Sequence, residues 1–198
     1  MGVGMAGNLH RHDLLTAVWN RTTSKAHASA QQSPCIVADA LTNIATHCDA
    51  LVTCVSADQD LKEIISTLQP TLRPGMLVID CSTVSASTAR ECAQLIEAAQ
   101  CHFLDAPVSG GVEGALLGTL AIMVGGSLQA FSQALPIFNA IGKTVTHFGD
   151  NGCGQAAKAA NQILCAGAIQ AAAEAMAFAK AEGLPLDKLI ETLSKGAG

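Results

Sequence analysis

Residues 76–108 read MLVIDCSTVSASTARECAQLIEAAQCHFLDAPV, and this stretch decides the fold. Two short and almost uninterrupted apolar runs, at 76–79 and 103–108, enclose an amphipathic segment near 86–100. Apolar runs of this length without alternating polar residues are typical of strands that are buried on both faces of a sheet. The strand–helix–strand order therefore predicts an α/β fold whose sheet is mostly parallel and covered by helices on both faces.

The same alternation extends on both sides of this stretch. Further strands are predicted from apolar runs at residues 14–19, 50–55, 120–124 and 145–148. Further helices are predicted near residues 58–68 and 127–140, and turn signals such as Gly125-Gly126 separate the elements. Residues 1–148 are thus predicted to form one doubly wound α/β domain.

The pattern changes after residue 148. Residues 149–154 (GDNGCG) form a joint rich in helix breakers, and an Ala-rich apolar stretch follows from 155 to about 182. At 1.5 Å per residue this stretch predicts a helix of roughly 40 Å. We therefore predict that residues 149–198 begin a second, helical domain. A helix this apolar has to be buried, which predicts either a homo-oligomer formed through this domain or further chain beyond residue 198.

Composition excludes several classes of protein. With 49% hydrophobic and 14% charged residues, the chain is neither disordered nor a coiled coil. A net charge of −5 without a basic cluster argues against nucleic acid as a partner, and neither a membrane span nor a signal peptide is expected. The eight cysteines lack C-x2-C spacing and lie mostly in apolar stretches, so we expect reduced thiols in a cytoplasmic protein. No cluster of histidine, cysteine or carboxylate side chains has the spacing of metal ligands.

The first seven residues, MGVGMAG, contain a literal G-x-G-x-x-G at Gly2, Gly4 and Gly7. In a dinucleotide-binding fingerprint a strand delivers the chain into the glycine turn. No strand precedes Gly2 here. The motif alone therefore leaves two interpretations, a dinucleotide turn or a set of small residues that lets a helix approach a sheet.

Four stretches, taken together, carry a more specific pattern. They are residues 19–22 (WNRT), 78–83 (VIDCST), 105–111 (DAPVSGG) and 154–162 (GQAAKAANQ). In order and spacing they resemble the β-hydroxyacid dehydrogenase family, which includes 3-hydroxyisobutyrate dehydrogenases and tartronate semialdehyde reductases. The resemblance covers essentially the whole chain. It implies a Rossmann-type, dinucleotide-binding domain over residues 1–148 and, over residues 149–198, the beginning of the helical substrate and dimerisation domain.

The resemblance also implies a register for the first residues. The family pattern G-L-G-x-M-G, followed by x-x-M-A-x-N-L, matches residues 1–2 with its closing M-G and residues 5–9 with its M-A-x-N-L. In this register Gly2 contacts the cofactor, while Gly4 and Gly7 lie inside the first helix. The first strand and the helices beyond residue 198 are then absent, so we expect a chain truncated at both ends and inactive by itself.

The residues after the strand at 14–19 are expected to select the cofactor. An Asp or Glu there would bind the ribose 2′-OH and repel a 2′-phosphate. This chain has Asn20, Arg21 and Thr22 instead. A guanidinium can contact a phosphate through two charge-assisted hydrogen bonds, and a threonine adds a hydroxyl donor. The sequence therefore favours NADPH over NADH, with an ordinary solvated arginine as the alternative.

Two further pairs of residues close strands of the predicted sheet. Val55 and Ser56 follow one strand, and Ser82 and Thr83 follow the next. Because open parallel sheets bind ligands beyond the carboxyl ends of their strands, these residues are predicted to line the nicotinamide half of the cofactor site. The family usually has Leu-Pro at the first pair. Ser56 departs from that pattern, and its contact is expected to be through the backbone.

Ser109, Gly110 and Gly111 follow the strand at 103–108. Glycines lack a Cβ atom and let backbone N–H groups approach an anion closely. The resemblance implies that these three residues hold the carboxylate of the substrate. Without it, they predict only a turn.

Lys158 is the only cation between residues 148 and 174. Burial disfavours the charged form of a lysine and lowers its pKa from about 10.4. Gln155 and Asn161 lie three residues away on either side, so all three share one helix face. The resemblance implies that Lys158 is the general acid/base and that Asn161 binds the substrate or orients the lysine. A structural lysine that extends its amine to solvent is the alternative.

These observations lead to one functional hypothesis and one alternative. The hypothesis is an NADP-dependent oxidoreductase that interconverts a small β-hydroxy acid and its semialdehyde, with Lys158 transferring the proton. The alternative is a catalytically inactive, dehydrogenase-like domain that binds a nucleotide or a partner protein.

Overall fold

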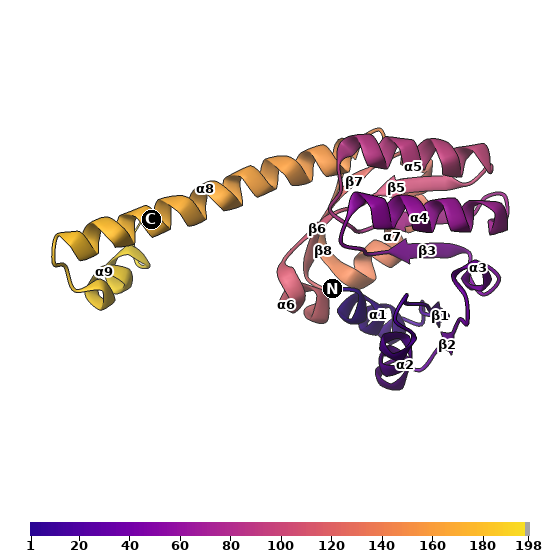
Figure 1. The fold of residues 1–198 in the computed structure, drawn as a ribbon, viewed down its shortest axis with the longest axis horizontal. Helices are drawn as coiled ribbons and strands as arrows, with labels where there is room; N and C mark the ends of the chain where they lie inside the picture. Colours follow the sequence, from indigo (N-terminus) through magenta and orange to yellow (C-terminus); the bar gives the residue numbers. More distant parts are fainter. Residues whose placement is uncertain (197–198) are drawn as a thin grey trace. The chain divides into compact units, whose positions relative to one another are not determined.

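The computed structural model describes residues 1–196 (Figure 1). In chain order its elements are α1 (Gly2–Arg11), β1 (Ala17–Val18), α2 (Thr23–Gln32), β2 (Ile36–Val37), α3 (Leu41–Ile44), β3 (Ala50–Thr53), α4 (Asp58–Leu68), η1 (Gln69–Thr71), β4 (Leu77–Asp80), α5 (Ala86–Ala98), β5 (His102–Asp105), β6 (Val108–Ser109), α6 (Gly111–Leu117), β7 (Leu120–Gly125), α7 (Leu128–Ile141), β8 (Gly142–Gly149), α8 (Cys153–Ala181) and α9 (Leu186–Leu193). Residues 1–158 form one compact unit, and a second unit begins at Ala159. The predicted α/β fold with a following helical segment is confirmed.

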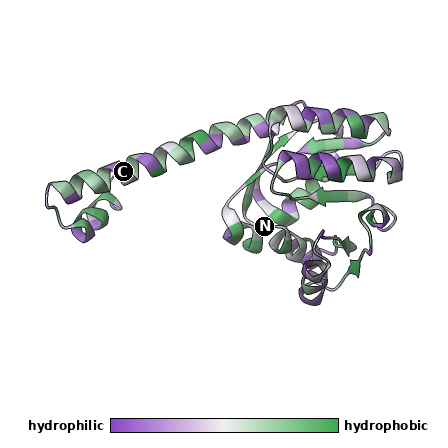
Figure 2. Cartoon of the chain, viewed as in Figure 1, coloured by the Kyte–Doolittle hydropathy of each residue, from purple (hydrophilic) through white to green (hydrophobic). Residues whose placement is uncertain are grey.

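A six-stranded sheet forms the centre of the first unit. β3, β4 and β5 run parallel, with Ala50 opposite Leu77 and Leu77 opposite His102. β7 pairs antiparallel with β5 and β6 and parallel with β8. Figure 2 shows that β3 and β5 are largely hydrophobic, as expected for strands covered on both faces.

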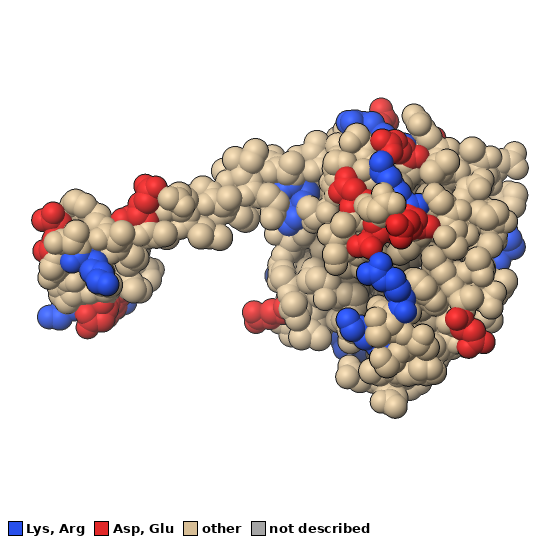
Figure 3. Space-filling view, viewed as in Figure 1, with Lys and Arg blue, Asp and Glu red and all other residues tan. Residues whose placement is uncertain are grey.

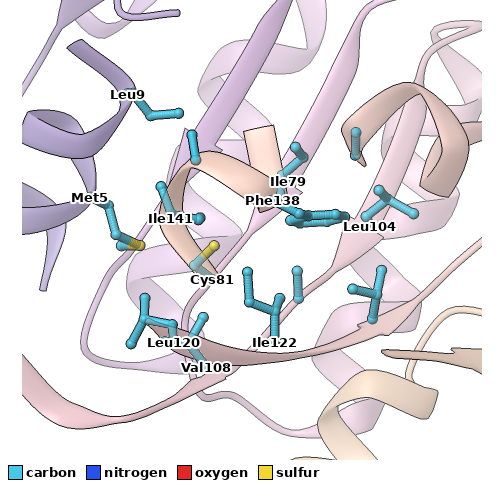
Figure 4. Packing of buried hydrophobic residues seen from close by; sticks show 14 of the residues in the cluster. Met5, Leu9, Ile79, Cys81, Leu104, Val108, Leu120, Ile122, Phe138 and Ile141 are labelled. Carbon is cyan, nitrogen blue, oxygen red and sulfur yellow. The ribbon is translucent and has the colours of Figure 1, made fainter. Parts of the chain in front are cut away.

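Helices cover the sheet on both faces, and alternate residues of β4 point to opposite sides. Val78 belongs to a buried cluster formed with α4 and α5, which includes Phe103. Ile79 belongs to a second cluster formed with α1 and α7, which includes Phe138. Figure 4 shows the second cluster, in which Met5 and the other labelled side chains converge between the helices and the sheet. The sheet is therefore doubly wound.

The first two strands form a separate, two-stranded parallel sheet. β1 and β3 are not neighbours in either sheet. A cavity of about 680 Å³ lies between α1, β1 and β3, and its walls include Val18, Leu51 and Val52. The strand expected at 14–19 is thus only two residues long and lies beside this cavity.

The strand expected at 103–108 is divided in two. β5 ends at Asp105 and β6 begins at Val108, with Pro107 between them. Proline has no N–H group to donate, so it interrupts the ladder. The Pro107 carbonyl accepts a hydrogen bond from Met123 N–H of β7, at 3.0 Å. This break lets β6 pair antiparallel with β7, so the chain turns back on the sheet immediately before Gly110.

The remainder of α8 and α9 make up the second unit. Four large apolar side chains of α8 are at least 66% exposed: Ile163, Leu164, Ile169 and Phe178. By length and composition α8 also passes the test for a membrane span, which core helices of soluble proteins pass too. No other helix among residues 1–196 passes it.

The start of α8 generates a stability prediction that compares two glycines of the same helix. A Cβ atom at Gly154 would lie 2.5 Å from the carbonyl oxygens of Asp105 and Met123, so Gly154→Ala forces the helix off the sheet. We expect this substitution to lower the free energy of unfolding by about 2 kcal/mol or more, as measured by urea unfolding.

Gly167→Ala is the matched control, because nothing lies within 4 Å of a Cβ atom at Gly167. Alanine in a helix interior is favoured over glycine by about 0.5–1 kcal/mol, so this variant should retain or gain helical content by circular dichroism. A Gly154→Ala protein as stable as the wild type would contradict the close contact between helix and sheet.

Candidate functional site

The carboxyl ends of β3, β4 and β5 place three polar side chains in one register. Thr53 lies opposite Asp80, and Asp80 lies opposite Asp105. Asp80 and Asp105 are fully buried. Ligands of open α/β sheets bind outside this edge, so polar groups here either contact a ligand or hold the loops that do.

A cavity of about 540 Å³ opens beside the ends of β1 and β3. The predicted cofactor residues Asn20, Arg21, Thr22, Val55 and Ser56 all line it. Its volume lies in the range of small-molecule sites. The structure therefore brings together residues from two strand ends that are more than thirty positions apart in the sequence.

Gly2 lies at the start of α1, close to the end of β3. Gly2 and Cys54 both line the 680 Å³ cavity. Burial raises the pKa of the Cys54 thiol and the charge of Asp80 adds to the rise, while the N-terminal amine and a hydrogen bond from the Gly2 backbone oppose it. Nothing lies within 4 Å of a Cβ atom at Gly2, so the space above this residue is open. Gly4 has the opposite environment, since its Cβ atom would lie 2.8 Å from the Ala115 backbone. Gly4 is thus a helix-packing residue, as the register of the resemblance implies.

The mouth of the 540 Å³ cavity carries charges of both signs. The Thr22 backbone N–H donates to Asn20 Oδ1 at 2.9 Å, which fixes the turn before α2. Arg21 forms an ion pair with Asp60 at 2.9 Å, and its side chain is 79% exposed. Lys25 is a second cation in the cavity wall. On the visible face of the first unit, Figure 3 shows acidic and basic side chains interspersed rather than gathered by sign.

Ser82 ties the ends of β3 and β4 together. Its Oγ accepts a hydrogen bond from Val55 N–H at 2.8 Å and donates to Asp80 Oδ1 at 2.6 Å. Ser82 is buried, whereas Thr83 is exposed. The Ser82 hydroxyl is thus committed to positioning Val55, and Thr83 is the member of the pair that faces solvent.

Asp80 is a fully buried acid at the end of β4. Its Oδ1 accepts from Thr53 Oγ1 at 2.7 Å and from Ser82, while its Oδ2 is buried with no hydrogen-bond partner among residues 1–196. Burial raises the pKa of Asp80 to about 6; the hydrogen bonds from Ser82 and Thr53 oppose the rise, and the charge of Asp105 adds to it. Asp80 therefore organises the two strand ends and gains a proton in mildly acidic solution.

The predicted anion-binding turn connects β6 to α6. Ser109 ends β6, and Gly110 and Gly111 have φ angles of 132° and 64°. Residues with a Cβ atom rarely adopt positive φ angles, so the turn depends on glycine at both positions. Nothing lies within 4 Å of a Cβ atom at Gly111, which leaves its backbone open to a ligand.

Lys158 is buried in the second turn of α8, with 7% of its surface exposed. The preceding turn is fixed to the sheet by Gln155. The Gln155 side chain donates from Nε2 to the Ser82 carbonyl at 2.9 Å and accepts at Oε1 from Val84 N–H at 3.2 Å. Asn161 lies three residues beyond Lys158, in the second unit. Within the first unit, Lys158 therefore lies one helical turn beyond Gln155, the residue whose side chain is bonded to the loop after β4.

Sequence reasoning missed the role of Asp105 at the same joint. Asp105 Oδ1 accepts from Gly152 N–H at 2.7 Å, and its Oδ2 accepts from Gln155 N–H at 2.9 Å. The available signal was an acid at the end of an apolar strand, together with the glycines at the start of α8. It acquires meaning only when the fold brings residues 105 and 152 together.

The pKa of Asp80 predicts how stability depends on pH. The value of about 6 in the folded protein lies above 3.8, so the folded state binds a proton more tightly than the unfolded state, and stability falls as pH rises from 4 to 7. The Asp80→Asn variant mimics the neutral form. The free energy of unfolding of the wild type, relative to Asp80→Asn, should fall by about 2 kcal/mol over this range.

Asp58→Asn is the control of opposite sign, because hydrogen bonds from Ser85 and Thr88 lower the pKa of Asp58. The wild type should be more stable than Asp58→Asn at neutral pH. This difference in the free energy of unfolding should disappear as pH falls through and below 3.8. Urea titrations at four or five pH values measure both differences. A wild type whose advantage over Asp80→Asn grows between pH 4 and 7 would contradict the assignment.

Comparison with known proteins identifies the family. Residues 1–149 match the family model described as the NAD binding domain of 6-phosphogluconate dehydrogenase. Residues 152–198 match the model described as the NAD-binding domain of NADP-dependent 3-hydroxyisobutyrate dehydrogenase. The two matches meet at the joint where α8 begins.

Individual relatives agree with the family models. An uncharacterised oxidoreductase of Synechocystis is 37% identical over 100% of this chain and 69% of its own length. The NAD-dependent L-serine dehydrogenase of Pseudomonas aeruginosa is 35% identical over 100% of this chain and 67% of its own length. A solved structure of Mycobacterium tuberculosis 3-hydroxyisobutyrate dehydrogenase with L-serine superposes with a TM-score of 0.91 at 31% identity, covering 100% of this chain and 68% of the other. The chain therefore belongs to the β-hydroxyacid dehydrogenase family of NAD(P)-dependent oxidoreductases.

Proposed function

We propose that this protein is an NADP-dependent oxidoreductase that interconverts a small β-hydroxy acid and its semialdehyde, with Lys158 as the general acid/base. The observation that carries the proposal is the position of Lys158. It is a buried amine one turn from Gln155, whose side chain is hydrogen-bonded to the loop that ends β4. The strand ends beside that loop are where a sheet of this type binds its ligand.

The residues present fit a dinucleotide. The 540 Å³ cavity is lined by the turn after β1 and the end of β3, and the open backbone at Gly2 lies close to the latter. Asn20, Arg21 and Thr22 would hold the adenosine end, while Val55, Ser56 and Thr83 would lie toward the nicotinamide end. When bound, the nicotinamide supplies or accepts the hydride.

The chain's own residues supply position and a proton. The Ser109 hydroxyl and the backbone N–H groups of Gly110 and Gly111 hold the substrate carboxylate. In the reducing direction Lys158 Nζ donates a proton to the carbonyl oxygen, and in the oxidising direction it removes the proton from the hydroxyl. Asn161 donates a hydrogen bond to the substrate. Burial around Lys158 excludes water and strengthens each of these interactions.

The preference for NADPH is supported by Arg21 and Thr22 at the cavity mouth. No acid occupies residues 20–22, where an Asp or Glu would favour NADH. Asp60 holds the Arg21 guanidinium at 2.9 Å. A 2′-phosphate would then compete with Asp60 for the guanidinium. The description of the matched second-domain model is NADP-dependent, whereas the Pseudomonas aeruginosa relative is named NAD-dependent, so the comparisons favour neither cofactor.

The role of Lys158 is tested by substitution in the whole protein. Lys158→Ala should lower kcat by about 10²–10⁴-fold, because the proton donor is lost. The dissociation constant for NADPH should change less than threefold, or about 0.6 kcal/mol, because Lys158 is not assigned to cofactor binding. Energy transfer from Trp19, the single tryptophan of residues 1–198 and a cavity residue, to bound NADPH measures that constant. A Lys158→Ala enzyme with unchanged turnover would exclude this mechanism. A wild-type protein that binds NADPH but turns over no semialdehyde would favour an inactive, dehydrogenase-like domain.

The cofactor preference is tested at Arg21. Arg21→Ala should weaken NADPH binding by about tenfold, or about 1.4 kcal/mol, and leave NADH binding unchanged, because only NADPH carries the 2′-phosphate. Asp60→Asn, which removes the competing carboxylate at nearly constant size, should leave NADPH binding equal or tighter. Both constants are read from Trp19 fluorescence. A wild type that binds NADH tenfold more tightly than NADPH would overturn the preference.

A further inference from the structure

The first turn of α8 has no capping side chain of its own. The residue before the helix is Gly152, at the position where Ser, Thr, Asp or Asn commonly supplies an oxygen to the free N–H groups. Gly152 has a φ angle of 91°, and a Cβ atom there would lie 2.9 Å from Arg90 Nε. A side chain at this position is therefore excluded by both backbone conformation and space.

Asp105 of β5 supplies the missing oxygens from 47 residues away in the sequence. Its two carboxylate oxygens accept from Gly152 N–H and Gln155 N–H, at 2.7 and 2.9 Å. These are the two N–H groups that a capping box satisfies from within one helix. A carboxylate at a helix N-terminus is also favoured by the helix dipole.

The joint is packed so closely that it admits little rearrangement. Cβ atoms at Gly154 and Gly125 would lie 2.5 Å and 2.6 Å from atoms of Asp105. Asp105 has no exposed surface. Burial raises the pKa of Asp105, and the N–H groups of Gly152 and Gln155 oppose the rise. The carboxyl group is thus removed from solvent and directed at the helix.

Lys158 follows Gln155 by three residues, a rise of about 4.5 Å along the helix axis. The direction of α8 at Gln155 therefore determines where the amine of Lys158 lies. Two sets of hydrogen bonds fix that direction. The Asp105 carboxylate binds the Gln155 backbone N–H, and the loop after β4 binds the Gln155 side chain. Displacement of a catalytic group by about 1 Å can reduce turnover by about 10²-fold.

We propose that Asp105 is a positioning residue for the reaction: by capping α8 from β5 it fixes the amine of Lys158 against the carboxyl ends of the strands. This proposal rests on the proposed function of Lys158. Asp105 touches neither substrate nor cofactor in it. Its effect reaches the chemistry through the first turn of the helix.

The test compares Asp105→Asn with Asp58→Asn in the whole protein. Asp58 is the control, because its carboxylate also binds the start of a helix from another element: it accepts from Ser85 N–H and from Thr88 Oγ1 at the start of α5, where Ser85 itself caps the helix. Asp58 lies outside the proposed site. In Asp105→Asn one acceptor becomes an NH₂ group facing a backbone N–H, so the cap is broken at nearly constant volume.

We expect Asp105→Asn to lower kcat by about 100-fold while KM and the NADPH dissociation constant change less than threefold. Asp58→Asn should lower the melting temperature with kcat within threefold of the wild type. A folded Asp105→Asn enzyme with kcat within threefold of the wild type would overturn the proposal. So would parallel changes in kcat, KM and cofactor affinity that match those of Asp58→Asn, since they would mark a merely structural role.

A second readout does not depend on turnover. Acetic anhydride labelling followed by mass spectrometry compares Lys158, which is 7% exposed, with the exposed Lys143 as an internal reference. Loss of the cap should raise the labelling rate of Lys158 relative to Lys143 by about tenfold, because the first turn opens locally. An unchanged ratio in Asp105→Asn would overturn the positioning role even if the wild type proved inactive. If the wild type is inactive but the ratio of Lys158 to Lys143 labelling rises in Asp105→Asn, the proposed function is refuted while the capping role of Asp105 stands.

Discussion

The contact of α8 with the edge of the sheet is the constraint on which this structure depends. Gly154 and Gly125 let the helix backbone approach the strand ends to a distance that a side chain at either position would prevent. The buried Asp105 carboxylate and the Gln155 side chain then fill the hydrogen-bonding needs of that contact. Buried and hydrogen-bonded networks are rigid, which supports the proposal that the helix holds Lys158 at a fixed position relative to β4 and β5.

The same edge explains why the two halves of the site are built differently. At the carboxyl ends of β3 and β4 the polar side chains are buried, and the Ser82 hydroxyl links Asp80 Oδ1 to Val55 N–H. At the mouth of the 540 Å³ cavity, Arg21 is mostly exposed and its ion pair with Asp60 is solvated. Exposed ion pairs contribute little to stability, so these charges are free to respond to a ligand. In the proposed function, the buried half positions the proton donor and the exposed half selects the cofactor.

Much of this could be predicted from the sequence. The doubly wound sheet followed from apolar runs such as residues 76–79, because burial on both faces leaves a signature in composition. Arg21 and Val55 were predicted as cofactor residues because strand ends meet at one edge, and both line the same cavity. The spacing of residues along the sequence was sufficient for a prediction wherever the pattern lay within a single strand or helix.

Contacts that join distant elements could not be predicted. The role of Asp105 depends on N–H groups 47 and 50 positions later in the chain, and nothing near residue 105 indicates them. Ser82 was expected at the cofactor, yet its hydroxyl is bound to Asp80 and to Val55 N–H, a pairing that requires the register of β3 and β4. The division of the strand at Pro107 was readable in principle, because proline interrupts a ladder, but its antiparallel outcome depends on β7.

The most direct measurement is the distance from Lys158 Nζ to the hydroxyl oxygen of a bound β-hydroxy acid, in a crystal structure of the whole protein with oxidised nicotinamide cofactor. The account predicts a hydrogen bond of about 2.6–3.2 Å, with the substrate carboxylate on Ser109, Gly110 and Gly111. A substrate whose hydroxyl is bound by another side chain, with the Lys158 amine beyond reach of a single bridging water, would contradict it.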